Sequence, residues 1–258
     1  MNEKKYFKIG IGKQEVQDTE RVYNTILENL KELSKQTDIE LIREAIYKLV
    51  DRIIEKLSSK DESLLLCTGK VHEKDYILAH SLDVCLLSIR IGMRIELNKE
   101  RLKELGYLAL IHARKDIGFP GELSRGIKRD SEMEEIIRLA DIYDALTHPP
   151  VYRHKMIPKE TLESIIGSEK FFDRRLIKIL LEEVSLYPLG SWVQLSTKEI
   201  GKVIKIAKGQ LMRPTVEIHV NWEGMRLKEP KIIDLTQKQL IHVLRPLSEE
   251  EIKVIKRV

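Results

Sequence analysis

Three side chains in this sequence combine a metal-ligand type with an apolar setting: His80, His112 and Asp141. They lie in the segments DYILAHSLDV, YLALIHARKD and IIRLADIYDALT, each predicted to be helical with the polar group on or beside an apolar face. A buried imidazole or carboxylate without a partner is costly. These groups therefore either satisfy one another or surround a cation, and two histidines with one carboxylate can bind a single Fe, Mn or Zn ion.

A fourth carboxylate extends this candidate site. Asp116 follows His112 by four residues, one helical turn further on, and is a predicted ligand provided that the helix persists. Each of these residues taken alone is more often a hydrogen-bonded core residue than a ligand. The residues themselves thus leave two interpretations open, a satisfied buried cluster without metal and a site for one divalent metal.

Two longer segments resemble known signatures. The stretch ADIYDALTHPPVYR resembles the signature that follows the catalytic loop in the HD-GYP class of metal-dependent phosphohydrolases, and HARKDIGFPGEL is similar to the His-Asp segment of that class. The later stretch YPLGSWVQLSTKEIGKVI resembles a β extension that often follows such domains. The resemblance covers about residues 40–245, and it implies a helical HD-type domain in which His80, His112 and Asp141 hold divalent metal.

The sequence departs from the class at positions that complete a two-metal centre. Ala113 stands where the class has the Asp of its His-Asp pair, and Asp116 stands where it has a phosphate-binding Lys. The stretch GELSRGIKRDSEMEE contains neither the two adjacent histidines nor the Gly-Tyr-Pro motif of the class. In two-metal phosphodiester hydrolysis, one cation activates water and the other stabilises the leaving oxygen. Loss of the bridging Asp therefore predicts a degenerate site that holds one metal at most.

Other residues near the site are candidate contacts. Arg114, Lys115 and Arg153 are predicted to meet an anionic ligand, against the alternative of a charged and solvated loop. Asp83 is interpreted as a surface carboxylate or one that supports a ligand, and Asp144 as a helix-packing or supporting carboxylate.

Helices must position these side chains, and apolar residues at helical spacing predict them. The predicted helices lie at about 18–36, 38–54, 61–67, 75–93, 99–114, 131–147, 158–167 and 173–186. Asp38, Asn98 and Asp173 are predicted N-caps. The apolar stripe of the first two helices packs either on the domain itself or on a second copy, so a homodimer is an open alternative.

The pattern changes to short β-type segments after Pro188. The segments SWVQLS, GKVIKIA, TVEIHVNW and KIIDL predict four or five strands in a small barrel-like domain, with Trp192 and Trp222 in its core. The fold class is therefore mainly α, an HD-type helical bundle followed by a small all-β domain. The predicted domains are an N-terminal helical region, the degenerate HD-GYP-like domain and the β domain, at 1–63, 64–187 and 188–258.

Composition narrows the class of protein. Of 258 residues, 42% are hydrophobic and 33% charged, a helix-favouring mix that is also typical of proteins from hot environments. The formal net charge is +4, with acidic and basic residues interleaved and no dense Lys/Arg run of the nucleic-acid type. Cys67 and Cys85 lie in apolar runs, which indicates buried thiols in a reducing compartment. No span is expected to cross a bilayer and no targeting segment is visible, so a cytoplasmic location without membrane contact is expected.

Three functions follow as hypotheses. We prefer a catalytically impaired HD-GYP-like protein that acts as a signalling, regulatory or scaffold module, with a cyclic dinucleotide or a signalling protein as its partner. The alternative is a divergent phosphohydrolase or phosphodiesterase that works with a single metal. A nucleotide sensor that keeps the pocket but not the reaction is compatible with the preferred hypothesis, and basic residues around the shortened loop motivate it.

Overall fold

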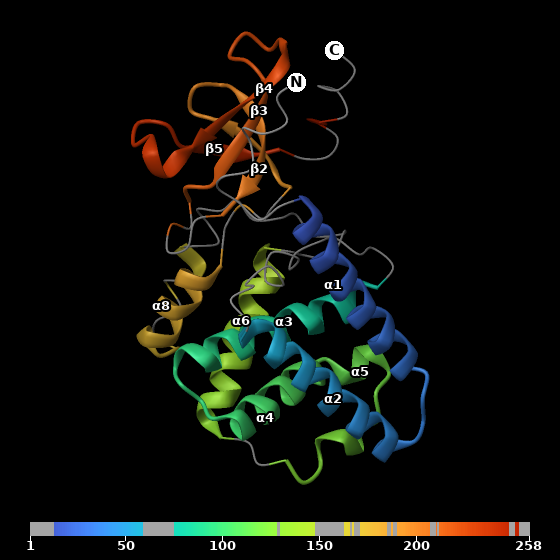
Figure 1. Ribbon diagram of the computed structural model, residues 1–258. Coiled ribbons are helices and arrows are strands. Elements are labelled where there is room, and N and C mark those ends of the chain that lie inside the picture. Colours follow the sequence, from blue (N-terminus) through green and yellow to red (C-terminus); the bar gives the residue numbers. More distant parts are fainter. Residues whose placement is uncertain are drawn as a thin grey trace. The chain divides into compact units, whose positions relative to one another are not determined.

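The computed structural model divides into two compact units (Figure 1). Among the described residues, the helical unit ends at residue 180 and the β unit begins at residue 181. The described residues are 13–58, 75–127, 130–147, 163–165, 167, 171–184, 187, 190–206, 210, 212–247 and 251–252. A mainly helical chain that ends in a small β domain was predicted, and this fold class is confirmed. The three predicted domain ranges stay predictions, because residues 59–74 and most of 185–189 lie outside the described part.

The helical unit is built from segments close to the predicted ones. Its elements within the described residues are α1 (Lys13–Leu33), α2 (Ile39–Ser58), α3 (Tyr76–Arg94), α4 (Lys99–Leu110), α5 (Arg114–Ile117), the 3-10 helix η2 (Gly121–Ser124), α6 (Ser131–Thr147) and α8 (Arg174–Glu183), whose last residues fall in the β unit. The predicted helix at 61–67 and most of that at 158–167 lie outside the described residues.

Three of the predicted caps lie within the described residues and are present, whereas Asp61, predicted to cap the helix at 61–67, lies outside them. The backbone N–H groups of Leu41, Arg101 and Arg175 donate to the side chains of Asp38, Asn98 and Asp173 over 3.1, 3.0 and 2.7 Å. Such bonds satisfy N–H groups that a helix leaves without a partner in its first turn. The starts of α2, α4 and α8 are therefore determined by local chemistry that the sequence shows directly.

Helix α3 is the centre of the helical unit and packs against α1, α2, α4 and α6. Two glycines allow the close packing around it. A Cβ at Gly106 would lie 2.7 Å from Val50 Cγ1 and 2.9 Å from Ile89 Cδ1, and one at Gly92 would lie 2.8 Å from Leu105 Cδ2. Neither position has room for a side chain, so the contacts of α4 with α2 and α3 depend on glycine.

The central position of α3 corrects one expectation from the sequence. Among the described residues, Tyr76–Arg94 is a helix long and apolar enough to cross a bilayer by length and composition, although no such span was expected. Within that stretch, 78% of the most apolar window is buried inside the protein. The helix is apolar on nearly all sides because other helices surround it, as is common for the core helix of a bundle.

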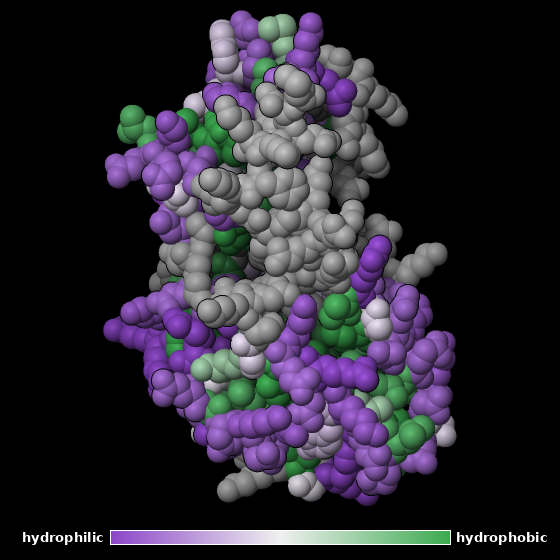
Figure 2. Space-filling view, viewed as in Figure 1, coloured by the Kyte–Doolittle hydropathy of each residue, from purple (hydrophilic) through white to green (hydrophobic). Residues whose placement is uncertain are grey.

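The apolar stripe of α2 is covered by the chain itself. Its buried residues are Ile42, Ile46, Leu49, Val50, Ile53, Ile54 and Leu57. The helix packs against α1, α3 and α4. Figure 2 shows hydrophilic residues over much of the visible face of the helical unit, with smaller hydrophobic patches between them. Most of the stripe on α2 is thus buried within one chain, whereas Leu41 is 53% exposed, and the homodimer stays a prediction.

The β unit contains one antiparallel five-stranded sheet in the order β4-β3-β2-β1-β5. Its strands are β1 (Trp192–Leu195), β2 (Ile200–Lys205), β3 (Thr215–Val220), β4 (Arg226–Asp234) and β5 (Val243–Pro246), with the 3-10 helix η4 (Leu235–Gln237) after β4. Alternate residues of the strands form a small apolar core that includes Val193, Val203, Val216, Ile218 and Ile233. Tyr187 and Leu235, the latter in η4, complete this core among the described residues.

The two tryptophans do not have the predicted role in that core. Trp222 lies in the turn between β3 and β4 and is 65% exposed, so its interpretation as a core residue was wrong. Trp192 is half-buried and packs on His219, with ring centroids 5.0 Å apart. Small β-branched and aliphatic side chains fill a sheet this small, and the large indoles are left at its surface.

Candidate metal centre

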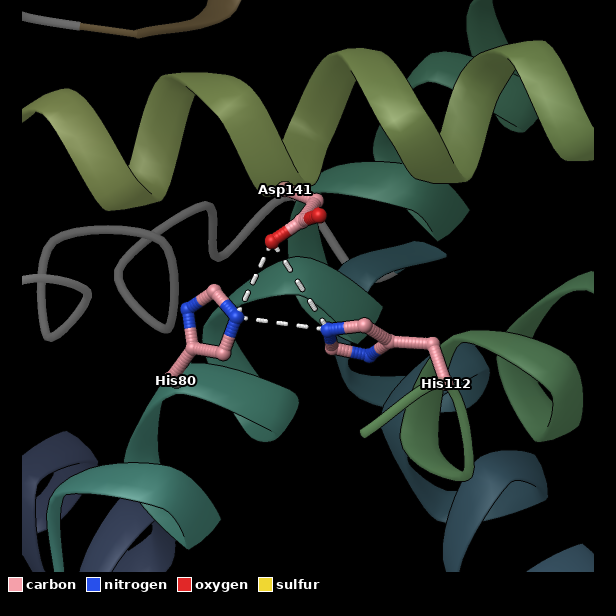
Figure 3. Close-up of side chains that lie close together, drawn as sticks. All are labelled: His80, His112 and Asp141. Carbon is pink, nitrogen blue, oxygen red and sulfur yellow. Dashed lines mark hydrogen bonds and ion pairs between the residues drawn. The ribbon is translucent and has the colours of Figure 1, made fainter. Parts of the chain in front are cut away.

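Three elements bring the candidate ligands together (Figure 3). His80 lies in the second turn of α3, and Asp141 lies on α6, which packs against α3. His112 lies in the turn that follows α4, whose last residue is Leu110. One potential ligand atom from each of the three residues falls within 4.8 Å of the other two. The structure therefore assembles the three residues that the sequence predicted as a group.

The contacts converge on Nε2 of each imidazole. His80 Nε2 lies 3.1 Å from Asp141 Oδ1 and 3.2 Å from His112 Nε2. His112 Nε2 lies 3.8 Å from the same Asp141 oxygen. These atoms form a small triangle whose corners are two ring nitrogens and one carboxylate oxygen.

The other ring nitrogens are both engaged away from this triangle. His80 Nδ1 lies 2.7 Å from Asp144 Oδ2, and His112 Nδ1 lies 2.6 Å from the Ala109 carbonyl oxygen. Each partner is an acceptor, so each Nδ1 carries hydrogen and donates it. In the neutral imidazoles the Nε2 atoms then present lone pairs, and three acceptors face one another. Such a set fits a cation at its centre, which is the arrangement that metal-binding histidines adopt.

A proton can take the place of a metal ion at His80. Burial by itself lowers the pKa of His80, but hydrogen bonds to Asp141 and Asp144 and their negative charges outweigh it and raise the pKa to about 9. His112 behaves in the opposite way, because burial and the charge of His80 lower its pKa. The two carboxylates thus make this position favourable for positive charge, and a metal ion that binds there displaces a proton.

The three side chains of the triangle differ in their exposure to solvent. The side chains of His80 and His112 are 10% and 17% exposed, whereas that of Asp141 is 42% exposed. Tyr76 stacks on the His80 ring with centroids 6.0 Å apart. Asp141 is therefore the member of the group with the greatest exposure to solvent, and the two imidazoles are largely buried.

Asp116 is not part of the group. It is exposed on α5, and the three ligand atoms within 4.8 Å come from the other predicted residues. The prediction required the helix to continue beyond His112, but α4 ends at Leu110 and α5 is a separate four-residue helix ended by Gly118 at φ 89°. As a ligand, Asp116 stays a prediction without support from this geometry.

The predicted anion contacts lie beside the triangle or outside the described residues. Lys115 is exposed, and Arg114 is half-buried with a buried Nε that has no hydrogen-bond partner. Arg153 lies outside the described residues. Arg114 and Lys115 therefore stay predictions, as two basic side chains at the start of α5.

Two carboxylates near the site are more deeply buried than a surface position would allow. Asp144 and Asp83 are 1% and 2% exposed. Asp83 accepts a 2.7 Å hydrogen bond from the Tyr23 hydroxyl of α1. Asp144 contacts His80 directly, so its interpretation as a supporting carboxylate agrees with the structure. The Ala109 carbonyl accepts the corresponding hydrogen bond from His112. The sequence did not predict this contact, because any residue type has a backbone carbonyl.

The segment that follows α5 is fixed to the helices behind it. The Tyr107 hydroxyl donates to the Leu123 carbonyl over 3.0 Å, and Arg43 donates to the Glu122 carbonyl over 3.3 Å. Leu123 is completely buried. This loop, where the HD-GYP resemblance implies additional histidines, instead presents apolar residues to the core and backbone carbonyls to α2 and α4.

Comparisons with known proteins agree with the order of the two units along the chain, in which the β unit follows the helical unit. Residues 192–255 match the model of a KOW domain associated with HD domain. A cyclic di-GMP phosphodiesterase of Pseudomonas aeruginosa is 21% identical over 244 residues, a match that covers 72% of this chain and 58% of that protein. The cyclic di-GMP phosphodiesterase PdeB of Borreliella burgdorferi is 24% identical over 211 residues, covering 78% and 50%.

These matches make the chain similar to HD-domain proteins and support its membership of that family at low identity. The chain spans between half and three-fifths of the length of these two relatives. No solved structure matches it. The His80, His112 and Asp141 group could hold a metal ion, as the resemblance to metal-dependent HD phosphohydrolases implied.

Proposed function

We propose that this HD-domain protein binds one divalent metal ion, Fe, Mn or Zn, through His80, His112 and Asp141, and acts as a catalytically impaired regulatory or scaffold module. The observation that carries the proposal is the triangle of two Nε2 atoms and one carboxylate oxygen, with both Nδ1 atoms committed elsewhere. Two imidazoles and one carboxylate suit these metals better than Mg or Ca, which prefer oxygen ligands.

The proposed impairment follows from what stands next to His112. Ala113 offers no oxygen with which to bridge two cations, and it lies at the start of α5. The following loop is held by Arg43 and Tyr107 through its backbone. A single cation supplies part of the charge that a two-metal centre places on the attacking and leaving oxygens of a phosphodiester. We therefore expect at most a small fraction of the hydrolysis rate of an intact two-metal enzyme.

The proposal is tested by metal analysis and an activity assay on the same protein. Elemental analysis after purification without chelator should give about one equivalent of Fe, Mn or Zn. Cyclic di-GMP incubated with the metal-loaded protein should remain intact. Rapid metal-dependent hydrolysis that is lost in His112→Ala would overturn the impairment, and a protein that takes up no metal on titration would overturn the metal site.

The alternative is a divergent single-metal phosphohydrolase. The 42% exposure of Asp141 favours it, because a metal there would be open to a substrate phosphate. Hydrolysis of phosphomonoesters or nucleotides in the presence of Mn or Fe, abolished in Asp141→Ala, would support this alternative. Absence of turnover across such a panel, with metal bound, would leave the regulatory function.

A cyclic dinucleotide is the proposed ligand, since two relatives are named cyclic di-GMP phosphodiesterases. Arg114 and Lys115 are its proposed phosphate contacts, joined by Arg153. Calorimetry with cyclic di-GMP should show binding that weakens in Arg114→Ala; no heat with the metal-loaded protein would exclude this ligand. A signalling protein as partner and a cytoplasmic location belong to the same proposal. A homodimer is a separate proposal, and the molecular mass in solution tests it.

A further inference from the structure

Asp144 connects the candidate metal centre to the core of the helical unit. It lies three residues after Asp141 on α6, so both carboxylates project from the same side of that helix. The two side chains differ in exposure: that of Asp144 is 1% exposed and that of Asp141 is 42% exposed. The exposed carboxylate of Asp141 contacts Nε2 of His80, and the buried carboxylate of Asp144 contacts Nδ1 of the same ring.

The contact of Asp144 with His80 determines which ring nitrogen can bind an ion. Asp144 Oδ2 lies 2.7 Å from His80 Nδ1, a short hydrogen bond of the charge-assisted kind. A carboxylate can only accept, so Nδ1 keeps its hydrogen and Nε2 keeps its lone pair. A buried carboxylate without such a donor would be costly, which holds the pair together.

The two histidines differ in this respect. His112 Nδ1 donates to the neutral Ala109 carbonyl, whereas His80 Nδ1 donates to a full negative charge. A negative partner makes the imidazole more basic and hence a better donor to a cation. The same fold thus provides one strongly supported and one weakly supported imidazole at a single site.

We propose that Asp144 is a positioning residue that makes Nε2 of His80 the principal metal-binding atom of this site. The inference rests on the proposed metal binding, and it ranks the two histidines by their contribution to the metal affinity. His80 supplies the larger share of the affinity, and Asp144 acts on the ion through the imidazole without touching it.

Metal titration of variants tests this role. We expect Asp144→Asn, which keeps the shape and removes the charge, to weaken Zn²⁺ binding by roughly 10–100-fold. The visible spectrum of the bound Co²⁺ form should change as well, because the ligand field of His80 changes. His80→Ala should weaken binding more than His112→Ala. Asp144→Ala is the second variant, in case the amide makes substitute hydrogen bonds.

Asp83→Asn is the matched control. Asp83 is a carboxylate buried to a similar degree on α3, and Tyr23 donates to it over 2.7 Å. Its loss should lower the melting temperature and leave the Zn²⁺ affinity and the Co²⁺ spectrum unchanged. All measurements are made below the melting temperature of every variant.

The outcomes separate this inference from the proposed function. Wild-type affinity and spectrum in both Asp144 variants would overturn the positioning role and leave the metal site intact. An equal loss of affinity in Asp83→Asn would also overturn it, because the effect would then reflect general loosening of the core. A wild-type protein that binds no metal would overturn the proposed function and this inference together.

Discussion

The two sides of the candidate metal centre differ in how they are built. On the side of α3 and α6, His80, Asp141 and Asp144 project from long helices that pack against each other. On the side of α4 and α5, His112 and Ala113 lie in a turn, and Asp116 follows in the four-residue helix α5. The first side has every residue that the family resemblance implies there, whereas on the second side Ala113 stands where the resemblance implies an acidic residue. Long packed helices thus position His80 and Asp141, whereas a turn beside a short helix positions His112.

The largest expected effect comes from the α3–α6 side. His80→Ala or Asp141→Ala should weaken Zn²⁺ binding at least about 100-fold, because each removes a direct ligand of a three-ligand set. Asp116→Ala, on the α5 side, should change the affinity by no more than about twofold, as expected for an exposed charge. Isothermal titration calorimetry measures all three. A loss in Asp116→Ala as large as that in His80→Ala would show that the α5 side also binds the ion.

The second expected effect is a pH dependence of opposite sign for the two imidazoles in chelator-treated protein. His80 has a pKa raised to about 9, so its stabilising contribution is complete below its unfolded pKa and is lost as the pH rises through 9. From a reference pKa of 6.5 this amounts to on the order of 3 kcal/mol. His112 has a lowered pKa, so its contribution is present above pH 6.5 and is lost as the pH falls.

Urea unfolding between pH 5 and 10 in wild type, His80→Gln and His112→Gln measures these contributions. The difference between wild type and His80→Gln should shrink at alkaline pH, and that for His112→Gln should shrink at acid pH. Parallel curves for both variants would contradict the asymmetry between the two sides.

The third effect concerns how closely each side is packed. Gly106→Ala should destabilise the protein by roughly 1–3 kcal/mol, because its Cβ would lie 2.7 Å from Val50 Cγ1 in the packed core. Gly118→Ala, at the end of α5, meets open space and should cost only about 1 kcal/mol for a φ of 89°. Equal losses of unfolding free energy in urea would indicate that the α5 side is packed as tightly as the α4 core.

The smallest expected effect is a gain in metal affinity. Ala113→Asp should return an oxygen next to His112 and strengthen Zn²⁺ binding by roughly tenfold, equivalent to about 1.4 kcal/mol. Hydrolysis of cyclic di-GMP should still be absent, because the loop after α5 is held by Arg43 and Tyr107 and offers no further histidine. Recovery of rapid hydrolysis from this single substitution would mean that the lack of histidines in this loop does not prevent hydrolysis.

Much of this structure could be predicted from the sequence because its causes are local. Helical periodicity and the side chains of Asp38, Asn98 and Asp173 determine where helices lie and begin. The alternation of apolar residues predicted the strands. The grouping of His80, His112 and Asp141 needed the family resemblance, since no local rule brings three helical segments together.

The remaining features depend on packing between distant segments. The spacing of Asp144 from Asp141 fits an exposed residue, a residue packed between helices and a residue that supports a ligand equally well. Only the packing of α3 against α6 shows that Asp144 contacts His80. The turn after Leu110 separates Asp116 from His112, although a continuous helical pattern predicted otherwise. Trp222 is hydrophobic in type but lies at the tip of a tight turn, where no layer covers it.

That exposed indole has a practical consequence for experiments on this chain. Both tryptophans, Trp192 and Trp222, belong to the β unit, and the sequence has no others. Intrinsic indole fluorescence therefore reports the β unit alone, whereas the far-ultraviolet circular dichroism signal comes mainly from the helices. A denaturation followed by both signals gives two curves, and their coincidence or separation measures whether the two units lose their structure as one cooperative body.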